Sequence, residues 1–223
     1  MAVILPVTSD LQKRFPGLQA LEGYVDKVRV EESGPELAEF GESIFSEIRQ
    51  KYTLDSVKDV SAFRAYRDFF WKVGIDPTKV RPASEALIRR ILAGKAIPKI
   101  NNVVDAYNLA SIKTEIALAA FDRDRLKGEL VMRQARPGEE FLGIGMRAPT
   151  ILNGKEVVLT DSEKLIAIYP HRDAETSKVA PSTSKLLILA CGVPQIDISS
   201  LEVAEKVAAS YIIRFCGGET EQE

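Results

Sequence analysis

The sequence predicts an α+β fold in which most of the helices precede most of the strands. In the first half of the chain, apolar residues recur at the three- and four-residue spacing of amphipathic helices. Beyond residue 118, short apolar segments are separated by Gly, Pro, Asn and Asp, as in short strands joined by turns. A further capped helix is expected near the C-terminus. This order of elements predicts helices packed against antiparallel or mixed sheets.

The first third of the chain is expected to contain two short strands and two helices. Residues 3–7 and 24–30 have the apolar pattern of strands. The tripeptide Ser33-Gly34-Pro35 predicts a helix start, because a proline in the first turn lacks only an N–H that would stay unpaired anyway. Gly74 is expected to end the second helix. The aromatic residues of that helix recur at helical spacing, which favours core packing over a ligand pocket: Phe63, Tyr66, Phe69 and Phe70.

The middle of the chain predicts two more helices. Residues 76–82 are rich in turn residues but too short for a flexible linker. Ser84 is expected to cap the first of these helices and Gly94 to end it. Asn101 or Asn102 is expected to cap the second, on which Asn108 lies beside the apolar stripe.

The last part of the chain predicts four short strands and a helix. The strands are expected at residues 128–135, 156–160, 164–169 and 185–191. Ser199 and Glu202 have the spacing of a capping box at the start of the helix, which Gly217 is expected to end.

Three parts of the chain are expected. Residues 1–77 form a strand and helix extension packed on the same unit as residues 78–217, and residues 218–223 form a frayed acidic tail.

Composition and charge exclude several classes of protein. The 223 residues are 45% hydrophobic and 28% charged, with a formal net charge of −2, which indicates a folded chain. The sequence contains no run of about 18 apolar residues, so no membrane helix is predicted. The N-terminus also lacks the basic region of a signal peptide. Cys191 and Cys216 belong to no Cys-x-x-Cys pair and are expected to be reduced thiols. We therefore expect a cytoplasmic protein without a membrane partner.

Generic catalytic motifs are absent from the sequence. It contains no Walker loop, no Gly-x-Gly-x-x-Gly and no Gly-x-Ser-x-Gly elbow. His171 is the only histidine, so neither a metal site nor a Ser-His-Asp triad is favoured. We expect no metal and no cofactor.

The polar segment between the third and fourth of these strands is a candidate ligand site. Four of its side chains bring hydrogen-bonding or charged groups to a strand end, where small-ligand pockets often form: His171, Arg172, Glu175 and Thr176. Arg172 suits a carboxylate or phosphate, and Glu175 suits an amino or hydroxyl group. The alternative is an ordinary polar surface loop.

Positive charge is concentrated in residues 79–136, which contain twelve Lys or Arg and six Asp or Glu. Such a region can attract a nucleic-acid backbone even when the whole chain is weakly acidic. The candidate contacts are Arg89, Arg90, Lys99, Arg123, Arg125 and Lys127. The alternative is a solvated face with local Asp–Arg pairs, as in residues 122–125.

Residues 98–122 resemble a known family signature. Asn-Asn-Val-Val-Asp-Ala-Tyr-Asn at residues 101–108 and Ala-Ala-Phe-Asp at residues 119–122 are similar to the motifs of the B3/B4 domain, the amino-acid-editing module of bacterial phenylalanyl-tRNA synthetase β subunits. Leu126-x-Gly128, the Arg-Pro-Gly-Glu at residues 136–139 and Ala174-Glu175 also fit. The resemblance covers roughly residues 78–200 and includes no synthetase catalytic core.

The resemblance implies a three-layer α+β domain with helices on one side of the sheets and a cleft between them. It implies a freestanding editing domain, in which Asn108 matches the family's asparagine and Glu175 its glutamate. The family's histidine position is Ala119 here, and a methyl group neither donates a hydrogen bond nor moves a proton. Hydrolysis of an ester does not strictly require that histidine, because water can be positioned by carbonyl groups and the terminal ribose hydroxyl.

Two functional hypotheses follow. In the first, the chain binds the aminoacylated 3′ end of a mischarged tRNA and hydrolyses the ester in trans. In the second, it is a non-catalytic module that binds tRNA or a free amino acid. The sequence leaves open the amino acid, the tRNA, the oligomeric state and any contribution of the N-terminal extension to the site.

Overall fold

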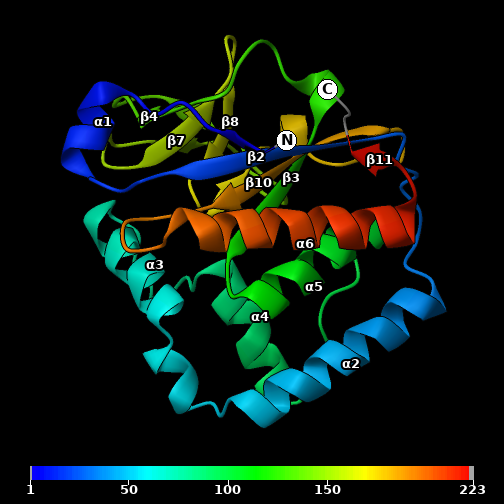
Figure 1. The fold of residues 1–223 in the computed structure, drawn as a ribbon. Helices are drawn as coiled ribbons and strands as arrows, with labels where there is room; N and C mark the ends of the chain where they lie inside the picture. Colours follow the sequence, from blue (N-terminus) through cyan, green and yellow to red (C-terminus); the bar gives the residue numbers. More distant parts are fainter. Residues whose placement is uncertain (1, 221–223) are drawn as a thin grey trace.

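A five-stranded antiparallel sheet forms the centre of the protein, which is described here from a computed structural model covering residues 2–220 (Figure 1). The strand order is β1-β2-β10-β3, and β11 pairs with β2 as well. The strands are β1 (Val3–Ile4), β2 (Ala20–Asp26), β3 (Ala117–Asp122), β10 (Lys185–Cys191) and β11 (Glu219–Thr220). Nearly every residue of β2, β3 and β10 is buried, because both faces of this sheet are covered.

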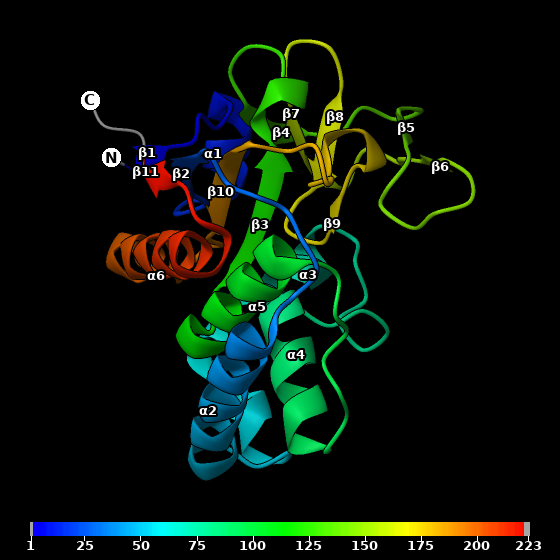
Figure 2. The same ribbon diagram turned by 90° about the vertical axis from the view of Figure 1, so that its right-hand side faces the viewer.

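A second antiparallel sheet covers one face of the first. Its order is β4-β7-β8-β9. The strands are β4 (Val131–Gln134), β7 (Val157–Thr160), β8 (Leu165–Ile168) and β9 (Arg172–Asp173). A separate two-stranded hairpin of β5 (Glu140–Phe141) and β6 (Thr150–Ile151) extends away from the body of the protein (Figure 2).

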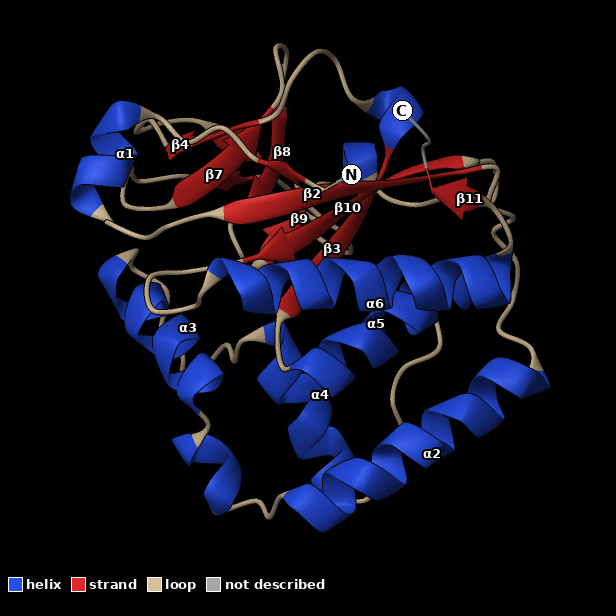
Figure 3. Cartoon of the chain, in the orientation of Figure 1, coloured by secondary structure: helices blue, strands red, loops and turns tan. Residues whose placement is uncertain are grey.

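The longer helices cover the other face, so the fold has three layers (Figure 3). They are α2 (Pro35–Lys51), α3 (Ser61–Lys72), α4 (Ala83–Leu92), α5 (Asn102–Thr114) and α6 (Ile198–Cys216). The short helix α1 (Ser9–Arg14) lies on the opposite side, beside β4. Three 3-10 turns complete the fold: η1 (Ser56–Asp59), η2 (Arg123–Arg125) and η3 (Glu175–Ser177). The predicted α+β class is confirmed.

Several helix ends follow the sequence. Gly34 precedes Pro35 at the start of α2, and the Asn101 side chain accepts a hydrogen bond from the Val104 amide at the start of α5. Gly74 and Gly94 adopt positive φ angles of 81° and 66° just after α3 and α4, where a left-handed residue ends the helix.

Two predicted caps are wrong. Ser84 lies inside α4, fully buried, and the residue that precedes the helix is Pro82. Ser199 lies inside α6, where Asp197 is the cap and accepts a hydrogen bond of 2.7 Å from the Ser200 amide. A carboxylate one residue before the helix reaches this amide directly, so no capping box is needed.

Strand boundaries also differ from the prediction. The first strand covers residues 3–4, the second covers residues 20–26 and not 24–30, and helix α1 was not expected. Residues 117–122 form β3, although the sequence assigned them no strand. Glu115 adopts a left-handed conformation with φ 65°, which ends α5 and redirects the chain into β3.

The N-terminal 77 residues share one hydrophobic core with the rest of the chain. Strand β2 pairs with β10 along its whole length, from Ala20 opposite Cys191 to Asp26 opposite Lys185. At the C-terminus, Glu219 and Thr220 pair with Asp26 and Val25 of β2, so this part of the expected frayed tail is ordered as β11. Residues 221–223 lie outside the described residues.

Candidate functional site

A small cavity of about 90 Å³ lies where strands β3, β9 and β10 meet. Ala119 of β3 and Leu189 of β10 are directly opposite each other in the sheet and both line it. The remaining lining residues are Ala83, Ala117, Leu118, Ala167, Tyr169, Pro170, His171, Arg172, Asp173 and Cys191. The cavity therefore brings the family's histidine position together with three residues of the predicted polar segment.

The β8–β9 turn is firmly attached to the central sheet. The Tyr169 hydroxyl donates a 2.5 Å hydrogen bond to the Gly192 carbonyl, and the His171 amide donates a 2.7 Å bond to the Ile168 carbonyl. The peptide bond between Tyr169 and Pro170 is cis. These bonds fix the backbone from which His171 and Asp173 reach the cavity.

Asp173 is the strongest electrostatic feature of the cavity. Its backbone pairs with Ala167 and its carbonyl accepts from the Ile144 amide at 2.9 Å. Within residues 2–220, its carboxylate has no hydrogen-bond or ion-pair partner. Burial raises the pKa of Asp173 to about 7, and the nearby Arg172 guanidinium offsets only part of this rise. An unpaired carboxylate in such a place favours a cationic ligand or a proton.

Two further groups lie within the electrostatic reach of Asp173. Burial raises the pKa of the Tyr107 hydroxyl on α5, and the Asp173 carboxylate adds to that rise. Burial likewise keeps the pKa of the Cys191 thiol well above its usual range, with a further contribution from Asp173. Both groups are therefore neutral near pH 7, and Cys191 is not an activated nucleophile.

His171 is neutral as well. Burial lowers the pKa of its imidazole, and the positive charge of Arg172 lowers it further. The ring stacks edge-on against Phe70 of α3, with centroids 6.2 Å apart. A residue of the N-terminal extension thus helps to position the cavity wall.

Arg172 is held at the rim and faces solvent. Its Nη1 donates to the Ile144 carbonyl at 3.2 Å, and its aliphatic stem lies over Gly143. A Cβ atom at Gly143 would come within 2.4 Å of the Arg172 Cδ atom, so only glycine admits this arrangement.

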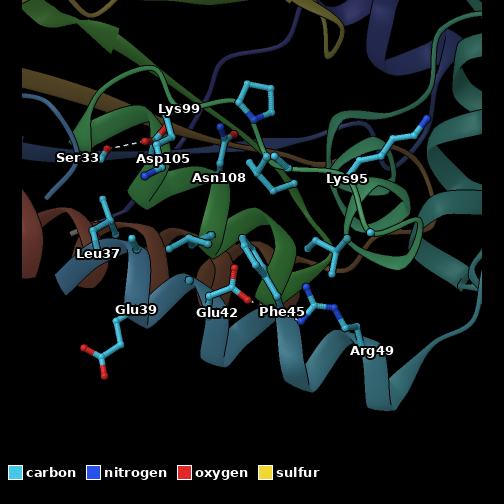
Figure 4. A pocket seen from close by; sticks show the side chains of 18 residues that line it. Ser33, Leu37, Glu39, Glu42, Phe45, Arg49, Lys95, Lys99, Asp105 and Asn108 are labelled. Carbon is cyan, nitrogen blue, oxygen red and sulfur yellow. Dashed lines mark hydrogen bonds and ion pairs between the residues drawn. The ribbon is translucent and has the colours of Figure 1, made fainter. Parts of the chain in front are cut away.

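The sequence predicts Asn108 and Glu175 in one cleft, and neither of the two cavities described here is lined by both residues. Asn108 lies on the wall of a larger pocket of about 540 Å³ between α2 and α5 (Figure 4). Glu175 lies on η3 and is ion-paired to Lys178, and it lines neither this pocket nor the small cavity. The 3-10 turn after β9 directs the Glu175 side chain towards Lys178. Thr176, next to it, is exposed.

The basic candidates fall into two separate groups. Arg89, Arg90 and Lys99 lie on α4 and the segment after it, whereas Arg123, Arg125 and Lys127 follow the far end of β3 (Figure 2). Most of them have internal partners: Arg89 pairs with Glu85, Arg90 with the Ala96 carbonyl, Arg123 with Asp26 and Arg125 with Asp122. Local pairing therefore accounts for much of the charge of these candidates, as in the alternative of a solvated face, and their contact with a nucleic-acid backbone stays a prediction.

The described residues contain no group of three or more His, Cys, Asp or Glu side chains that could hold a metal ion. Within the same residues, no helix is long and apolar enough to cross a bilayer. The cavity instead combines a carboxylate, a neutral imidazole and a nearby phenol. Such groups can hold an ammonium ion and orient water.

Sequence reasoning missed Asp173, Tyr107 and Cys191 as parts of the site. Asp173 lies within the predicted polar segment, and Tyr107 lies beside Asn108 in the family motif. Their connection depends on the packing of β9 near α5, which no local pattern in the sequence reveals.

Comparison with known proteins places this fold among relatives of a synthetase subunit. A phenylalanine–tRNA ligase beta subunit of Onion yellows phytoplasma is 32% identical over 114 residues, which is 51% of this chain and 14% of the relative. The corresponding subunit of Geobacter metallireducens is 35% identical over 117 residues, covering 49% of this chain and 14% of the relative. This chain therefore matches only a small part of each relative's length.

A solved structure agrees in fold. An N-terminal fragment of the phenylalanyl-tRNA synthetase beta subunit from Pyrococcus horikoshii has a TM-score of 0.52 and 14% identity, and the match covers 97% of this chain and 49% of that one. The model of the B3/4 domain matches residues 65–217, well over half of the chain. The chain therefore belongs to the B3/4 domain family and is related to the phenylalanine–tRNA ligase beta subunit.

Proposed function

We propose that this protein hydrolyses the ester bond of mischarged aminoacyl-tRNA in trans, in the cytoplasm, with the aminoacyl group bound in the cavity beside Ala119. The observation that carries the proposal is the unpaired Asp173 carboxylate in a cavity that also contains the family's histidine position. Family membership supports a tRNA end as the substrate.

The charge of the cavity favours an aminoacyl ester over a free amino acid. Both carry an α-ammonium group, which an unpaired, partly buried carboxylate attracts. A free amino acid also brings a carboxylate, whose repulsion by Asp173 would have to be offset. In the ester the amino acid's carboxylate is replaced by a neutral ester group, so the α-ammonium can pair with Asp173 without this repulsion.

The hydrolysis needs one water molecule and no cofactor. The water oxygen attacks the ester carbonyl carbon, the bond from that carbon to the ribose oxygen breaks, and the ribose oxygen takes up a proton. The products are the free amino acid and a tRNA with a free terminal hydroxyl. In this proposal Asp173 holds the α-ammonium, and the neutral His171 imidazole orients the water.

A non-catalytic module is the second candidate. It is favoured by Ala119, which supplies no proton-transfer group where the family has a histidine. The same cavity would then hold an aminoacyl end without cleaving it.

Deacylation assays with labelled mischarged tRNAs separate these possibilities. We expect hydrolysis by the wild type and at least a tenfold loss in Asp173→Asn, which keeps the side-chain shape but removes the charge. Glu163→Gln, in an exposed turn away from the cavity, is the matched control.

Each outcome has a definite meaning. If Glu175→Gln abolishes hydrolysis and Asp173→Asn does not, the glutamate implied by the family resemblance carries the reaction and the cavity assignment is wrong. If the wild type binds mischarged tRNA without cleaving any of it, the non-catalytic candidate is correct.

A further inference from the structure

Two adjoining pockets form a groove over helices α3 and α4, in the helical layer of the protein (Figure 1). Their volumes are about 470 Å³ and about 260 Å³, and Arg81 and Arg89 line both of them. The walls come from the segment around η1, from the two helices and from the connection between them. We call it the α3–α4 groove and define it by its charged and aromatic lining: Lys58, Arg67, Trp71, Lys79, Arg81, Arg89, Arg90 and Lys95.

The charged side chains that line this groove are all positive. Seven lining residues are Lys or Arg, and in the described part of the chain neither pocket has an Asp or Glu among its lining residues. An ordinary solvated face mixes charges of both signs. A concave surface of one sign has a strong positive potential, which attracts anions.

A single carboxylate holds three of the arginines in place. Glu85 is fully buried, and its Oε2 atom lies 2.8 Å from Arg67 Nε. Its Oε1 atom lies 2.6 Å from Arg89 Nε and 3.8 Å from Arg81 Nε. Arg67 and Arg89 each donate a further hydrogen bond, at 3.4 Å and 3.3 Å, to a backbone carbonyl within residues 54–58. Because these donors are already ordered, an anion that binds them loses less entropy.

The other four cations have little to neutralise them. Lys58, Arg90 and Lys95 have no ion-pair partner within residues 2–220. Arg90 donates to a backbone carbonyl, which leaves its charge in place. The Lys79 side chain is 82% exposed, and its partner Asp76 lies 3.8 Å away. Even with Asp76 and the buried carboxylate counted, five of the seven positive charges remain.

Trp71 provides an aromatic surface at one end of the groove. It lines the smaller pocket and is 57% exposed, although the other aromatic residues of α3 are buried. Its ring therefore contributes little to the core. An exposed indole beside cationic groups suits a nucleobase, because bases stack on aromatic side chains whatever their identity.

The concentration of charge favours directly linked phosphates over an RNA strand. Five Lys or Arg side chains line the larger pocket alone. Along an RNA strand a ribose separates each phosphate from the next, so the negative charges are spread out. In a nucleoside polyphosphate the phosphates are linked to one another, and several negative charges enter one pocket together.

We propose that the α3–α4 groove binds a nucleoside polyphosphate, with the base on Trp71 and the linked phosphates in the larger pocket. Arg81 and Arg89 lie between the two ends, and Lys79 and Lys95 bind the outer phosphates. No residue that lines the groove also lines the Asp173 cavity, so this binding site goes beyond the proposed deacylation and does not depend on it.

The full-length protein carries its own reporter for this binding, because Trp71 is the only tryptophan of the chain. ATP and GTP should quench its fluorescence and should bind within about threefold of each other, since stacking distinguishes bases weakly. AMP, with fewer charges, should bind at least tenfold more weakly. The affinity for ATP should fall at least threefold from low to high salt.

Two substitutions separate the phosphate end of the groove from the base end. Lys79→Gln combined with Lys95→Gln should weaken the binding of both ATP and inorganic tripolyphosphate at least fivefold, measured by calorimetry. Trp71→Leu should weaken ATP binding at least threefold and leave tripolyphosphate binding unchanged, whereas Trp71→Phe should retain most of the affinity for ATP. All three side chains are exposed and lie outside the Glu85 ion pairs, so the variants should fold.

The control removes two exposed lysines elsewhere. Lys13→Gln on α1, combined with Lys127→Gln beyond β3, makes the same change in net charge and should alter neither ATP nor tripolyphosphate binding. Equal losses in this control and in the Lys79 and Lys95 variant would show that only the net charge matters, which would overturn the proposal.

Two other results would also overturn it. One is the absence of ATP and GTP binding at low salt. The other is a single-stranded oligoribonucleotide that binds at least tenfold more tightly than ATP and loses that affinity in the Lys79 and Lys95 variant, because the groove would then be an RNA surface. Measured deacylation, present or absent, bears only on the proposed function.

Discussion

Ala119 and Leu189 face each other across the β3–β10 pair, and both line the small cavity. Ala119, which the family resemblance matches to a histidine, therefore has an apolar neighbour and shares its cavity with the unpaired carboxylate of Asp173. In the proposed function, recognition at this site depends on space and on one negative charge.

Filling this space should stop the reaction. Ala119→Leu adds three carbon atoms to a cavity of about 90 Å³. We expect at least a tenfold loss of deacylation and a loss of about 1–3 kcal/mol in the free energy of unfolding from overpacking. Steady-state deacylation and urea unfolding measure the two effects.

Ala120→Leu is the matched control, because Ala120 lies on the other face of the same strand, opposite Ile188. It should destabilise the protein without a specific loss of activity. Equal activity losses in both variants would show that strain in β3, and not occupation of the cavity, is responsible.

Asp173 should make the stability of the protein fall as pH rises. Its pKa is about 7 in the folded protein and close to 3.9 when unfolded, so the folded state binds more protons between these values. The stabilisation is fully present below about pH 4 and is lost as pH rises through 7. The total change is a few kcal/mol at most, since one pKa unit corresponds to about 1.4 kcal/mol.

Asp173→Asn removes this dependence. Relative to the wild type, the variant should gain about 2–4 kcal/mol in the free energy of unfolding between pH 5 and pH 8.5. Urea unfolding at the two pH values gives the difference directly. If the stabilities of wild type and variant differ by the same amount at both pH values, the Asp173 carboxylate is solvated or paired in solution.

Glu85 should be critical for joining α3 to α4. It is fully buried and ion-paired to both Arg67 of α3 and Arg89 of α4. The Arg67 Nε atom lies 2.8 Å from Glu85 Oε2, and the Arg89 Nε atom lies 2.6 Å from Glu85 Oε1. Glu85→Ala leaves both guanidinium groups without their partner. We expect a loss of about 3–5 kcal/mol in the free energy of unfolding.

Glu42→Ala provides the comparison for Glu85, because the Glu42–Arg49 pair is exposed and 3.7 Å long. Its loss should cost less than about 1 kcal/mol and should vanish in high salt. Similar losses in the free energy of unfolding for the two variants would show that the buried Glu85 ion pairs are not essential for holding α3 against α4.

Glu22 is a buried carboxylate that should be better replaced by an amide. Its Oε1 atom has no hydrogen-bond partner within residues 2–220, while Oε2 accepts from the Tyr24 hydroxyl at 2.5 Å. Burial raises the pKa of Glu22, and the charge of Glu129 raises it further.

Glu22→Gln should therefore stabilise the protein at pH 8 by about 1 kcal/mol, because it removes a buried charge and keeps an acceptor for Tyr24. The gain should be smaller at pH 5, because the raised pKa of Glu22 makes protonation of the wild-type carboxyl easier as pH falls. Chemical unfolding at both pH values measures it, with Glu202→Gln on the exposed side of α6 as the control. Destabilisation at pH 8 would mean that the Glu22 charge has a favourable partner in solution.

Local signals in the sequence predicted the fold class and several helix ends. Pro35 in a first turn and Asn101 as a cap act through bonds to neighbouring residues, so their effects are visible without tertiary structure. Strand β3 was missed because its alanine-rich sequence has little strand preference of its own. Its conformation is imposed by pairing with β10.

The candidate site was less predictable than the fold. Ala119, His171 and Arg172 do line one cavity, yet Asn108 and Glu175 do not share it. The pKa of Asp173 depends on the burial of its carboxylate and on the nearby Arg172 guanidinium, and Asp173 in turn raises the pKa of Tyr107, which is 66 residues away in the sequence. A sequence records none of these contacts, which arise only when β9 is placed near α5.

The pairing of β2 with β10 has a consequence for biosynthesis. Ala20 pairs with Cys191, so the central sheet cannot close until the ribosome has released the chain beyond residue 191. Closing such a long loop carries a large entropic penalty before any contact compensates for it. Until then β2 has an unpaired edge, and this interval is when the nascent chain would be most exposed to aggregation and in most need of a chaperone.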